Sequence, residues 1–546
     1  MFLKVVKSKG NEYLRIVESY REGGRVRHRT ILNLGRLDQI EGNPSFQRLG
    51  ERLIEFSKGS LTNLKDASEG ELLNYGYVVY EKIWNDFDMP KLLASLLYDR
   101  NVEFDLPKAC LLMVIQHLLE PKSKLATYEG QSRYLKLPHI GYNHLYRALD
   151  VVAEDKETLE QAIFERERSL FNMQVDVVFY DVTTFYFEST SADSLKDFGF
   201  SKDGKFKEVQ VVLGLITDCE GRPVGYELFP GNTFDGKTLL EALRGMERHF
   251  GLRRVVVVAD RGINSKLNLK LIRDKGYDYV VAARLKSMNG SVRKSALDEE
   301  GYVFLNEGRE DELRYKVLPY VNVVKDELGQ SHRLEERLIV TFSRKRAEKD
   351  EADRMRLLQK AEELLESPCR IDSSNKRGGK KYIKNAGAKA TWTLDEEAIE
   401  RDASFDGYYA IQTSSQDMTA LEVIDVYHKL WRIEESFRIM KSTLEVRPIF
   451  HWTERRIKGH FVICFLAFLL ERTLELKLKD AGEPASPKQI REALNSMNFT
   501  KVSVKGEDFL IKVKGTPLSQ KILQVMRIKS PKNVTPLKDV KLISQR

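Results

Sequence analysis

The 546-residue chain contains little cysteine. Its four cysteines lie far apart, at Cys110, Cys219, Cys369 and Cys464. They form no Cys-x-x-Cys pair, which excludes a disulfide scaffold and a cysteine zinc finger and predicts a reducing, intracellular setting. The longest apolar run, Phe461–Leu470, has ten residues. It is too short to span a bilayer and predicts a buried helix. Because Met1–Lys7 has no secretory pattern, the expected protein is cytoplasmic, with no membrane partner.

The chain is only mildly basic overall, with a net charge of +8, but basic residues are concentrated in two places. Lys and Arg number 89 against 81 Asp and Glu. Lys501–Arg546 holds 11 basic and three acidic residues, and Arg370–Ala390 holds seven and one. Such stretches favour a polyanionic partner, nucleic acid above all, although a lysine-rich soluble surface gives the same count.

Length and composition predict a multidomain globular protein. Hydrophobic residues make up 42% and charged residues 31%, and 546 residues exceed what one core can organise. Residues 1–65 predict a small β module, because the alternating stretches Tyr13–Tyr20 and Val26–Leu34 flank the turn Glu22–Gly24. Residues 66–172 predict a helical, DNA-binding domain, with helical patterns over Pro107–Leu119 and Leu145–Leu170.

The pattern changes at residue 173. Three strand-like segments are followed by helix, strand, helix and strand: Val175–Phe187, Glu208–Thr217, Pro223–Phe229, Leu239–Phe250, Arg254–Ala259, Lys266–Lys275 and Tyr277–Ala282. The first three can pair antiparallel and the later alternation needs crossovers. This order predicts an α/β ribonuclease H-like mixed sheet.

The remaining regions are an insertion and a tail. Residues 286–400 break the alternation with strand-like Glu336–Phe342 and helical Ala347–Glu366, and predict a β-rich insertion. The catalytic core is therefore expected over 173–285 and 401–475. Residues 476–546 form a basic C-terminal region, where Pro517, Pro531 and Pro536 interrupt long helices. The sequence assigns this region no fold.

Three acidic residues are the candidate catalytic and metal-binding groups. Asp181 lies inside the first core strand, and Asp260 ends the apolar strand Val255–Ala259. A charge there is costly unless it is paired or binds a metal. Glu434 lies on a helix expected over Tyr427–Lys441. Each residue alone is more often a turn, cap or surface residue, so only their conjunction predicts a site.

The Glu434 helix presents one distinct face. At roughly 100° per residue, Tyr427, Glu434 and Lys441 fall within about 20° of one line, with Arg438 beside them. Mg²⁺, which Mn²⁺ could replace, prefers carboxylate oxygens. Two such ions can activate a water or 3′-hydroxyl and stabilise the leaving oxygen. Asp181 is the candidate shared ligand, and the flanking residues are candidate phosphate contacts.

These residues resemble the DDE transposases of bacterial insertion sequences, in the class with a Y-R-E-K signature helix. The matching segments are Phe179–Thr184, Gly199–Asp203, Gly231–Asp235, Val258–Gly262 and Tyr427–Lys441. The likeness covers roughly residues 172–475. It implies a ribonuclease H-like core interrupted by an insertion, and a homodimer that pairs two double-stranded transposon ends, cuts them and joins them to target DNA.

The resemblance also bears on DNA contacts. Lys202 and Arg261, which lie within matching segments, are further candidates, and Trp431 could stack on an unpaired base or pack against the sheet. The signature arginine is missing, because Leu430 stands at its position. Arg438 is better placed than Arg432 to replace it.

Two other functions fit parts of the sequence. Gly231–Thr238 matches the P-loop pattern G-x-x-x-x-G-K-[ST], which favours an ATPase. Asp235 beside the phosphate cradle and bulky Phe234 argue against it. A non-catalytic DNA-binding protein would explain the basic regions but not the acids. His451 and His460 are expected to be core or surface histidines rather than metal ligands.

Overall fold

A computed structural model describes most of the chain and divides it into two units. The described residues are 1–23, 25–56, 70–98, 100–171, 177–199, 204–205, 207–233, 235–250, 255–260, 264–305, 312–326, 329–374, 378–387, 391–504 and 507–540. One unit contains Met1–Leu72, Thr500–Lys512 and Lys532–Val540, and the other contains Leu73–Phe499 and Val513–Pro531. Among the described residues, no helix is both long and apolar enough to cross a membrane.

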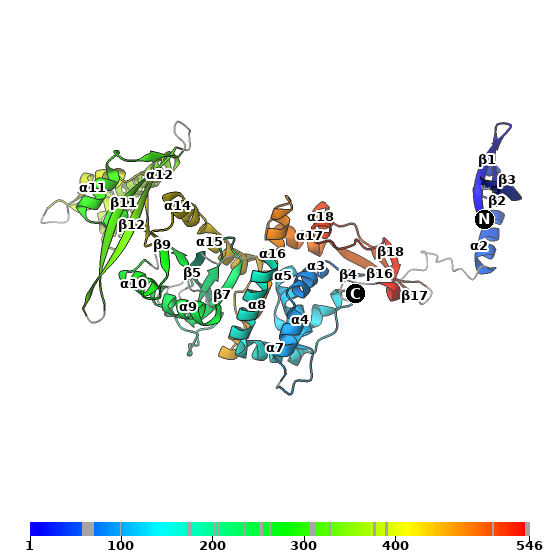
Figure 1. Cartoon of the computed structure of the whole chain (residues 1–546), viewed down its shortest axis with the longest axis horizontal. Helices are drawn as coiled ribbons and strands as arrows, with labels where there is room; N and C mark the ends of the chain where they lie inside the picture. The colour runs from blue at the N-terminus through cyan, green and yellow to red at the C-terminus, as the bar shows by residue number, and fades with distance from the viewer. Residues whose placement is uncertain are drawn as a thin grey trace. The chain divides into compact units, whose positions relative to one another are not determined.

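The N-terminal segment folds as a three-stranded antiparallel sheet with two helices (Figure 1). Its elements are β1 (Phe2–Ser8), β2 (Asn11–Glu22), β3 (Arg25–Arg36), α1 (Leu37–Ile40) and α2 (Pro44–Phe56). The expected hairpin is confirmed as β2 and β3. Gly23 has a φ of 58° at the turn, a conformation that favours glycine. Gly24 lies outside the described residues.

The C-terminal region is folded, although the sequence assigned it no fold. It contains α17 (Pro487–Asn495), α18 (Pro517–Val525) and the strands β16 (Asn498–Val504), β17 (Glu507–Lys512) and β18 (Val534–Pro536). With β4 (Glu71–Asn74) these strands form a sheet in the order β18-β17-β16-β4. Pro517 is the first residue of α18, where a missing N–H costs nothing. The prolines therefore mark element boundaries, not an absence of structure.

A helical layer surrounds the long buried helix α16. Its helices are α3 (Val78–Asp86), α4 (Met89–Ser95), α5 (Leu106–Leu119), α6 (Lys124–Gly130), α7 (Tyr142–Glu154), α8 (Lys156–Phe171) and α16 (Glu454–Asp480). α16 packs against α3, α5 and α7. The apolar run Phe461–Leu470 is buried on all sides within it, as expected. The helical patterns expected over Pro107–Leu119 and Leu145–Leu170 are confirmed, with a break at Asp155 between α7 and α8.

The core is one nine-stranded mixed sheet in the order β10-β11-β12-β15-β9-β8-β5-β6-β7. Its strands are β5 (Val177–Tyr186), β6 (Gln210–Thr217), β7 (Pro223–Pro230), β8 (Val256–Ala259), β9 (Asp278–Ala282), β10 (Val303–Phe304), β11 (Leu313–Lys325), β12 (Ser331–Ser343) and β15 (Tyr408–Thr413). β5, β6 and β7 pair antiparallel, whereas β5, β8 and β9 are parallel. This arrangement fits the ribonuclease H-like core that the sequence predicts.

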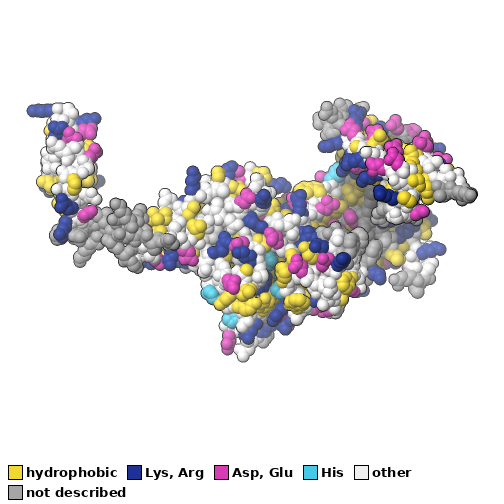
Figure 2. Space-filling view, turned by 180° about the vertical axis from the view of Figure 1, so that it is seen from behind, with side chains coloured by type: hydrophobic (Ala, Val, Ile, Leu, Met, Phe, Trp, Pro, Cys, Tyr) yellow, Lys and Arg dark blue, Asp and Glu magenta, His cyan; other side chains and the backbone are white. Residues whose placement is uncertain are grey.

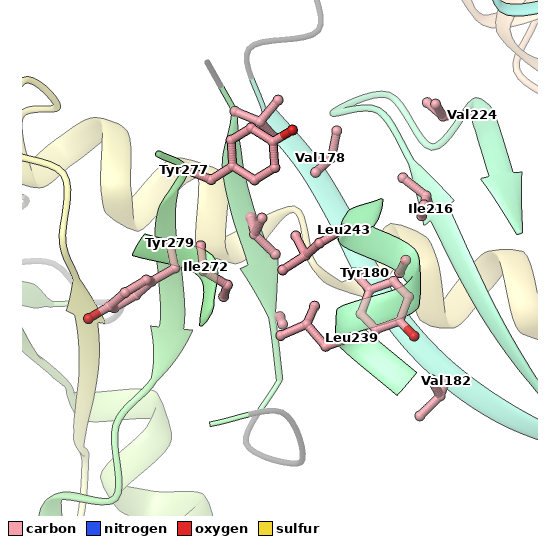
Figure 3. Close-up of a cluster of buried hydrophobic side chains, with 14 of the residues drawn as sticks. Val178, Tyr180, Val182, Ile216, Val224, Leu239, Leu243, Ile272, Tyr277 and Tyr279 are labelled. Atoms are coloured by element: carbon pink, nitrogen blue, oxygen red, sulfur yellow. The ribbon is translucent and has the colours of Figure 1, made fainter. Parts of the chain in front are cut away.

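One face of the central strands packs against α9 (Asp235–Phe250) and α10 (Lys266–Asp274). Figure 3 shows the buried cluster, in which Leu239, Leu243 and Ile272 meet β5 and its neighbours. The β5 residues in the cluster are Val178, Tyr180 and Val182. Because side chains alternate along a strand, the odd-numbered residues of β5 belong to the opposite face.

The segment between β9 and β15 extends the same sheet. β15 pairs with β9 on one side and with β12 on the other, and β11 and β12 form a long hairpin. The segment also contains α11 (Gly290–Leu297), α12 (Arg344–Leu365), α13 (Glu396–Ala403) and the small hairpin of β13 (Ile383–Asn385) and β14 (Trp392–Leu394). The predicted strand and charged helix are confirmed as β12 and α12. The insertion is therefore continuous with the core sheet.

On the face shown in Figure 2, basic and acidic side chains are interspersed.

Candidate active site

Asp181 lies on β5, and Asp260 directly follows β8, the adjacent parallel strand. β5 and β8 pair with Phe179 opposite Val258. Asp181 and Asp260 each lie two residues further along, so the continued register places them opposite one another. Adjacent strands are about 4.8 Å apart. Both aspartates are half-buried, and Asp181 Oδ1 accepts a hydrogen bond of 2.7 Å from the Val182 N–H.

Asp181 belongs to the sheet face that the Glu434 segment covers. Its neighbours Tyr180 and Val182 belong to the cluster on the α9 and α10 side, as the sequence predicted. Phe185, on the same side of β5 as Asp181, packs edge-on against Phe461 of α16 at 5.4 Å between ring centroids. Helix α15 (Trp431–Arg438), which carries Glu434, contacts β5 directly. Helix α15 and strand β5 are therefore in contact, and these two neighbouring elements carry Glu434 and Asp181.

The acidic helix is not the single helix that the sequence predicted. α14 (Ala420–His428) ends before a turn, α15 follows, and a π-helix spans Ile439–Thr443. Leu430 and Arg432 donate backbone hydrogen bonds to carbonyls three residues earlier. The expectation of one straight helix over Tyr427–Lys441 is therefore wrong, and an alignment calculated for 3.6 residues per turn does not apply.

Adjacent glutamates on α15 have different environments. Glu434 is exposed, and no described residue forms a hydrogen bond or an ion pair with its carboxylate. Glu435 lies 3.2 Å from the Arg472 guanidinium on α16 and 3.4 Å from Arg438. Glu435 therefore anchors the helix, whereas Glu434 is available to an external cation.

The candidate DNA contacts differ in their exposure and in their partners. The Tyr427 hydroxyl accepts a hydrogen bond from Tyr409 of β15, and Lys441 Nζ lies 5.7 Å from the Phe185 ring centroid on β5. Trp431 is 54% exposed, so it is not packed against the sheet. The Arg438 side chain is 73% exposed. Lys202 and Arg261 lie outside the described residues.

The structure also clarifies the missing arginine. Leu430, which stands at the signature position, is buried. Arg432 donates a 3.0 Å hydrogen bond to the Cys219 carbonyl and so points away from Glu434, as expected. Arg346 of α12, which was no candidate from the sequence, has its guanidinium 4.6 Å above the ring of Tyr409, whose hydroxyl donates to Tyr427. No local pattern could reveal it, because Arg346 and Tyr409 meet only through the pairing of β12 with β15.

The P-loop alternative is not favoured. A P-loop presents free backbone N–H groups to phosphates. Here the Gly231 N–H donates to the Leu195 carbonyl at 3.3 Å, and the Thr233 N–H donates to Pro230 at 2.9 Å. The segment follows β7, an edge strand that is antiparallel to β6. Its glycine supports close backbone packing, since a Cβ at Gly231 would lie 2.2 Å from the Gln210 carbonyl oxygen.

Comparison with known structures gives two weak likenesses. The chain is similar to a piggyBac transposase synaptic complex with hairpin DNA, with 8% identity, 79% of this chain and 82% of that chain covered, and a TM-score of 0.34. It is also similar to a Mos1 transposase paired-end complex with the left transposon end, with 14% identity, 44% and 68% covered, and a TM-score of 0.15. Both scores are too low to support any conclusion about this chain.

Comparison with sequence families is decisive. Residues 174–470 match the transposase DDE domain, and residues 3–64 match the N-terminal domain of IS1634 family transposases. No curated protein matches the sequence. A non-catalytic DNA-binding protein is not favoured by these matches. The DDE match covers more than half of the chain, which therefore belongs to the DDE transposases of bacterial insertion sequences and is a DNA-cutting and DNA-joining enzyme.

Proposed function

We propose that Asp181, Asp260 and Glu434 are the catalytic acids of this transposase and hold its divalent metal ions. The observation that supports this most directly is the parallel pairing of β5 with β8, whose register, continued by two residues, would set the two aspartates opposite one another. Helix α15 contacts β5 and adds an exposed carboxylate without a described partner. Asp181 lies on the strand that both other elements adjoin, so it is the shared ligand.

The donor set fits a hard divalent cation. All three groups are carboxylates, half-buried or exposed, as Mg²⁺ and Mn²⁺ prefer and as a thiolate-binding metal does not. DDE transposases act with divalent metals in general, and we assign Mg²⁺ here with Mn²⁺ as substitute. When bound, such ions activate the attacking water or 3′-hydroxyl and stabilise the leaving oxygen. The chain's own task is to hold the scissile phosphate in line with that oxygen.

The surrounding side chains position the DNA. Lys441 and Arg438 supply positive charge beside Glu434, and the exposed Trp431 can stack on an unpaired base. We assign Tyr427, Lys202 and Arg261 to the same contact surface. We further propose that two chains pair two double-stranded ends, and that residues 1–65, 66–172, 286–400 and 476–546 flank the core over 173–285 and 401–475.

The acids can be tested with three substitutions and one matched control. Asp181→Asn, Asp260→Asn and Glu434→Gln should each reduce cleavage and strand transfer of end-sequence DNA by at least ~100-fold, because each removes a metal ligand. DNA binding should persist. Asp425→Asn, which changes an exposed acid of α14 paired with Lys429 at 2.7 Å, should leave cleavage unchanged.

Metal dependence completes the test. Wild-type cleavage should require Mg²⁺ or Mn²⁺ and stop with chelator. A Glu434→Gln enzyme that cleaves at the wild-type rate would remove Glu434 from the site. Cleavage that persists in all three variants would overturn the assignment. Light scattering with and without end DNA tests whether two chains assemble.

A further inference from the structure

A second group of metal-ligating side chains lies buried between α5 and α16, away from the three acids. It consists of His117 on α5 with His460 and Cys464 on α16, whose ligand atoms all lie within 4.8 Å of one another. All three are buried. The two histidines line a partly open cavity of about 150 Å³, which His451 also lines. Nothing in the transposition chemistry requires these residues.

The hydrogen bonding of His117 matches that of a metal-binding histidine. Its Nδ1 hydrogen-bonds to the Leu444 carbonyl at 3.2 Å, which assigns the ring proton to that nitrogen. Its Nε2 is buried and has no hydrogen-bond partner, so a lone pair points into the interior without compensation. An orphaned polar atom of this kind is costly. Metal-bound histidines use this arrangement, with the distal N–H donating to a backbone carbonyl.

His460 and Cys464 present a second and a third donor. They lie four residues apart on α16, which puts them on one helix face. His460 Nε2 lies 3.3 Å from the Val446 carbonyl, which leaves Nδ1 as the lone-pair nitrogen. Cys464 Sγ lies 3.6 Å and 3.9 Å from the two ring nitrogens of His460. Donor atoms around a tetrahedral zinc ion are about 3.5 Å apart, so the 3.9 Å between Cys464 Sγ and His460 Nδ1 needs a small shift of one side chain.

We propose that His117 Nε2, His460 Nδ1 and Cys464 Sγ bind a structural Zn²⁺ ion, with His451 or water in the fourth position. The His451 ring centroid lies 5.0 Å from that of His460, within reach of a shared ion. Nitrogen and sulfur donors select zinc over Mg²⁺. The site is therefore chemically distinct from the carboxylate site.

Burial disfavours the charged forms of the candidate ligands, and the positive charge of buried Lys124 opposes a cation unless a thiolate offsets it. Burial lowers the pKa of His117 and of His451 to about 3, so both imidazoles are neutral and can act as ligands. Lys124 is buried beside them, and burial lowers its pKa to about 8. Burial raises the pKa of the Cys464 thiol to about 12, and Lys124 lowers it in part. A Cys464 thiolate on zinc would offset the Lys124 charge.

The proposed ion would secure the chain that follows the catalytic glutamate. Leu444 and Val446, whose carbonyls accept from the two histidines, directly follow the π-helix after α15. His451 precedes the first residue of α16. The metal would therefore tie α5, α16 and this connecting loop together, and stabilise the position of α15 indirectly.

Metal analysis and spectroscopy of the whole chain test the proposal. Purified wild-type protein should contain one zinc ion per chain by mass spectrometry of metals. Cobalt substitution should produce a sulfur-to-cobalt charge-transfer band. Cys464→Ser should abolish that band, and His117→Gln or His460→Gln should lower the zinc content. Cys110→Ser, which changes another buried cysteine on α5, should change neither.

The zinc content and the charge-transfer band distinguish this site from the carboxylate site. Asp181→Asn should keep both the zinc and the charge-transfer band, because the band requires sulfur ligation. Absence of zinc from the wild-type protein, together with no band after cobalt addition, would overturn the proposal. A band that survives Cys464→Ser would also overturn it. Both outcomes are measured on the wild-type protein or on Cys464→Ser, which changes one atom. The test of the zinc site therefore does not depend on whether a histidine variant folds.

Discussion

The guanidinium of Arg472 on α16 lies 3.2 Å from the carboxylate of Glu435 on α15, next to Glu434 in sequence. Arg472 also lies 3.2 Å from Glu475 and donates to the Ser436 hydroxyl at 3.4 Å. Its side chain is only 7% exposed. Since α15 is a short segment between a turn and a π-helix, this contact with the long buried helix restricts where Glu434 can lie.

Replacing Arg472 should therefore affect stability and activity together. Arg472→Met leaves Glu475 without its described partner and leaves Glu435 with only the exposed Arg438, so it should destabilise the fold by about 3 kcal/mol and reduce DNA cleavage. Arg438→Met removes an exposed pair with the same Glu435 and should change stability by less than about 1 kcal/mol. Urea unfolding measures both. Equal effects of the two substitutions would show that the buried contact does not anchor α15.

The close packing of β5 against β6 should make the fold sensitive to substitution of Gly214. A Cβ there would lie 2.5 Å from the Tyr180 hydroxyl oxygen, one residue from Asp181 along β5. Gly214→Ala should cost about 1–3 kcal/mol and reduce cleavage about ten- to a hundredfold by displacing Asp181. Tyr180→Phe removes the nearest atom and should restore part of both. Gly130→Ala, where nothing lies within 4 Å, is the control.

Buried Glu81 should give the fold a pH dependence. Burial raises the pKa of this carboxyl from 4.5 to about 7, against a smaller lowering by Lys108. The folded state therefore binds the proton more tightly than the unfolded state, and stability falls as pH rises from about 4.5 to about 7. The loss is about 3 kcal/mol at most.

Glu81→Gln, which stays neutral, should lessen that fall. Chemical unfolding at several pH values measures the slope, and exposed Glu129→Gln serves as the comparison. A wild-type slope unchanged by Glu81→Gln would mean that the buried carboxyl does not titrate in this range.

Phosphate contacts near Glu434 should appear in the salt dependence of DNA binding. Arg438→Gln should weaken binding and reduce the slope of log K against log salt by about 0.9, the value for one lost phosphate contact on duplex DNA. Arg356→Gln, an exposed arginine of α12 paired with Asp353 at 3.0 Å, provides a comparison. An unchanged slope for Arg438→Gln would remove that residue from the DNA surface.

The local elements of the core could be predicted from sequence because their signals are local. Alternating and continuous apolar runs identified β5, β8 and β9 within one or two residues of their observed ends. Strand order followed from connection lengths and handedness. The C-terminal prolines were misleading. Proline is tolerated at the first position of a helix but not inside one, and the sequence does not show where the helix begins.

Sequence alone identified the candidate acids: an aspartate within one buried strand, an aspartate after another, and a glutamate on a helix. Which residues lie near them depended on how the chain packs. The pairing of β5 with β8 brings the strand that carries Asp181 beside the strand that ends just before Asp260. The difference between Glu434 and Glu435 arises from a buried arginine on a helix that follows later in the chain. The His117, His460 and Cys464 cluster is likewise absent from any local pattern. Contacts between distant segments depend on packing of the whole core, and side-chain periodicity along one segment contains no information about its partner.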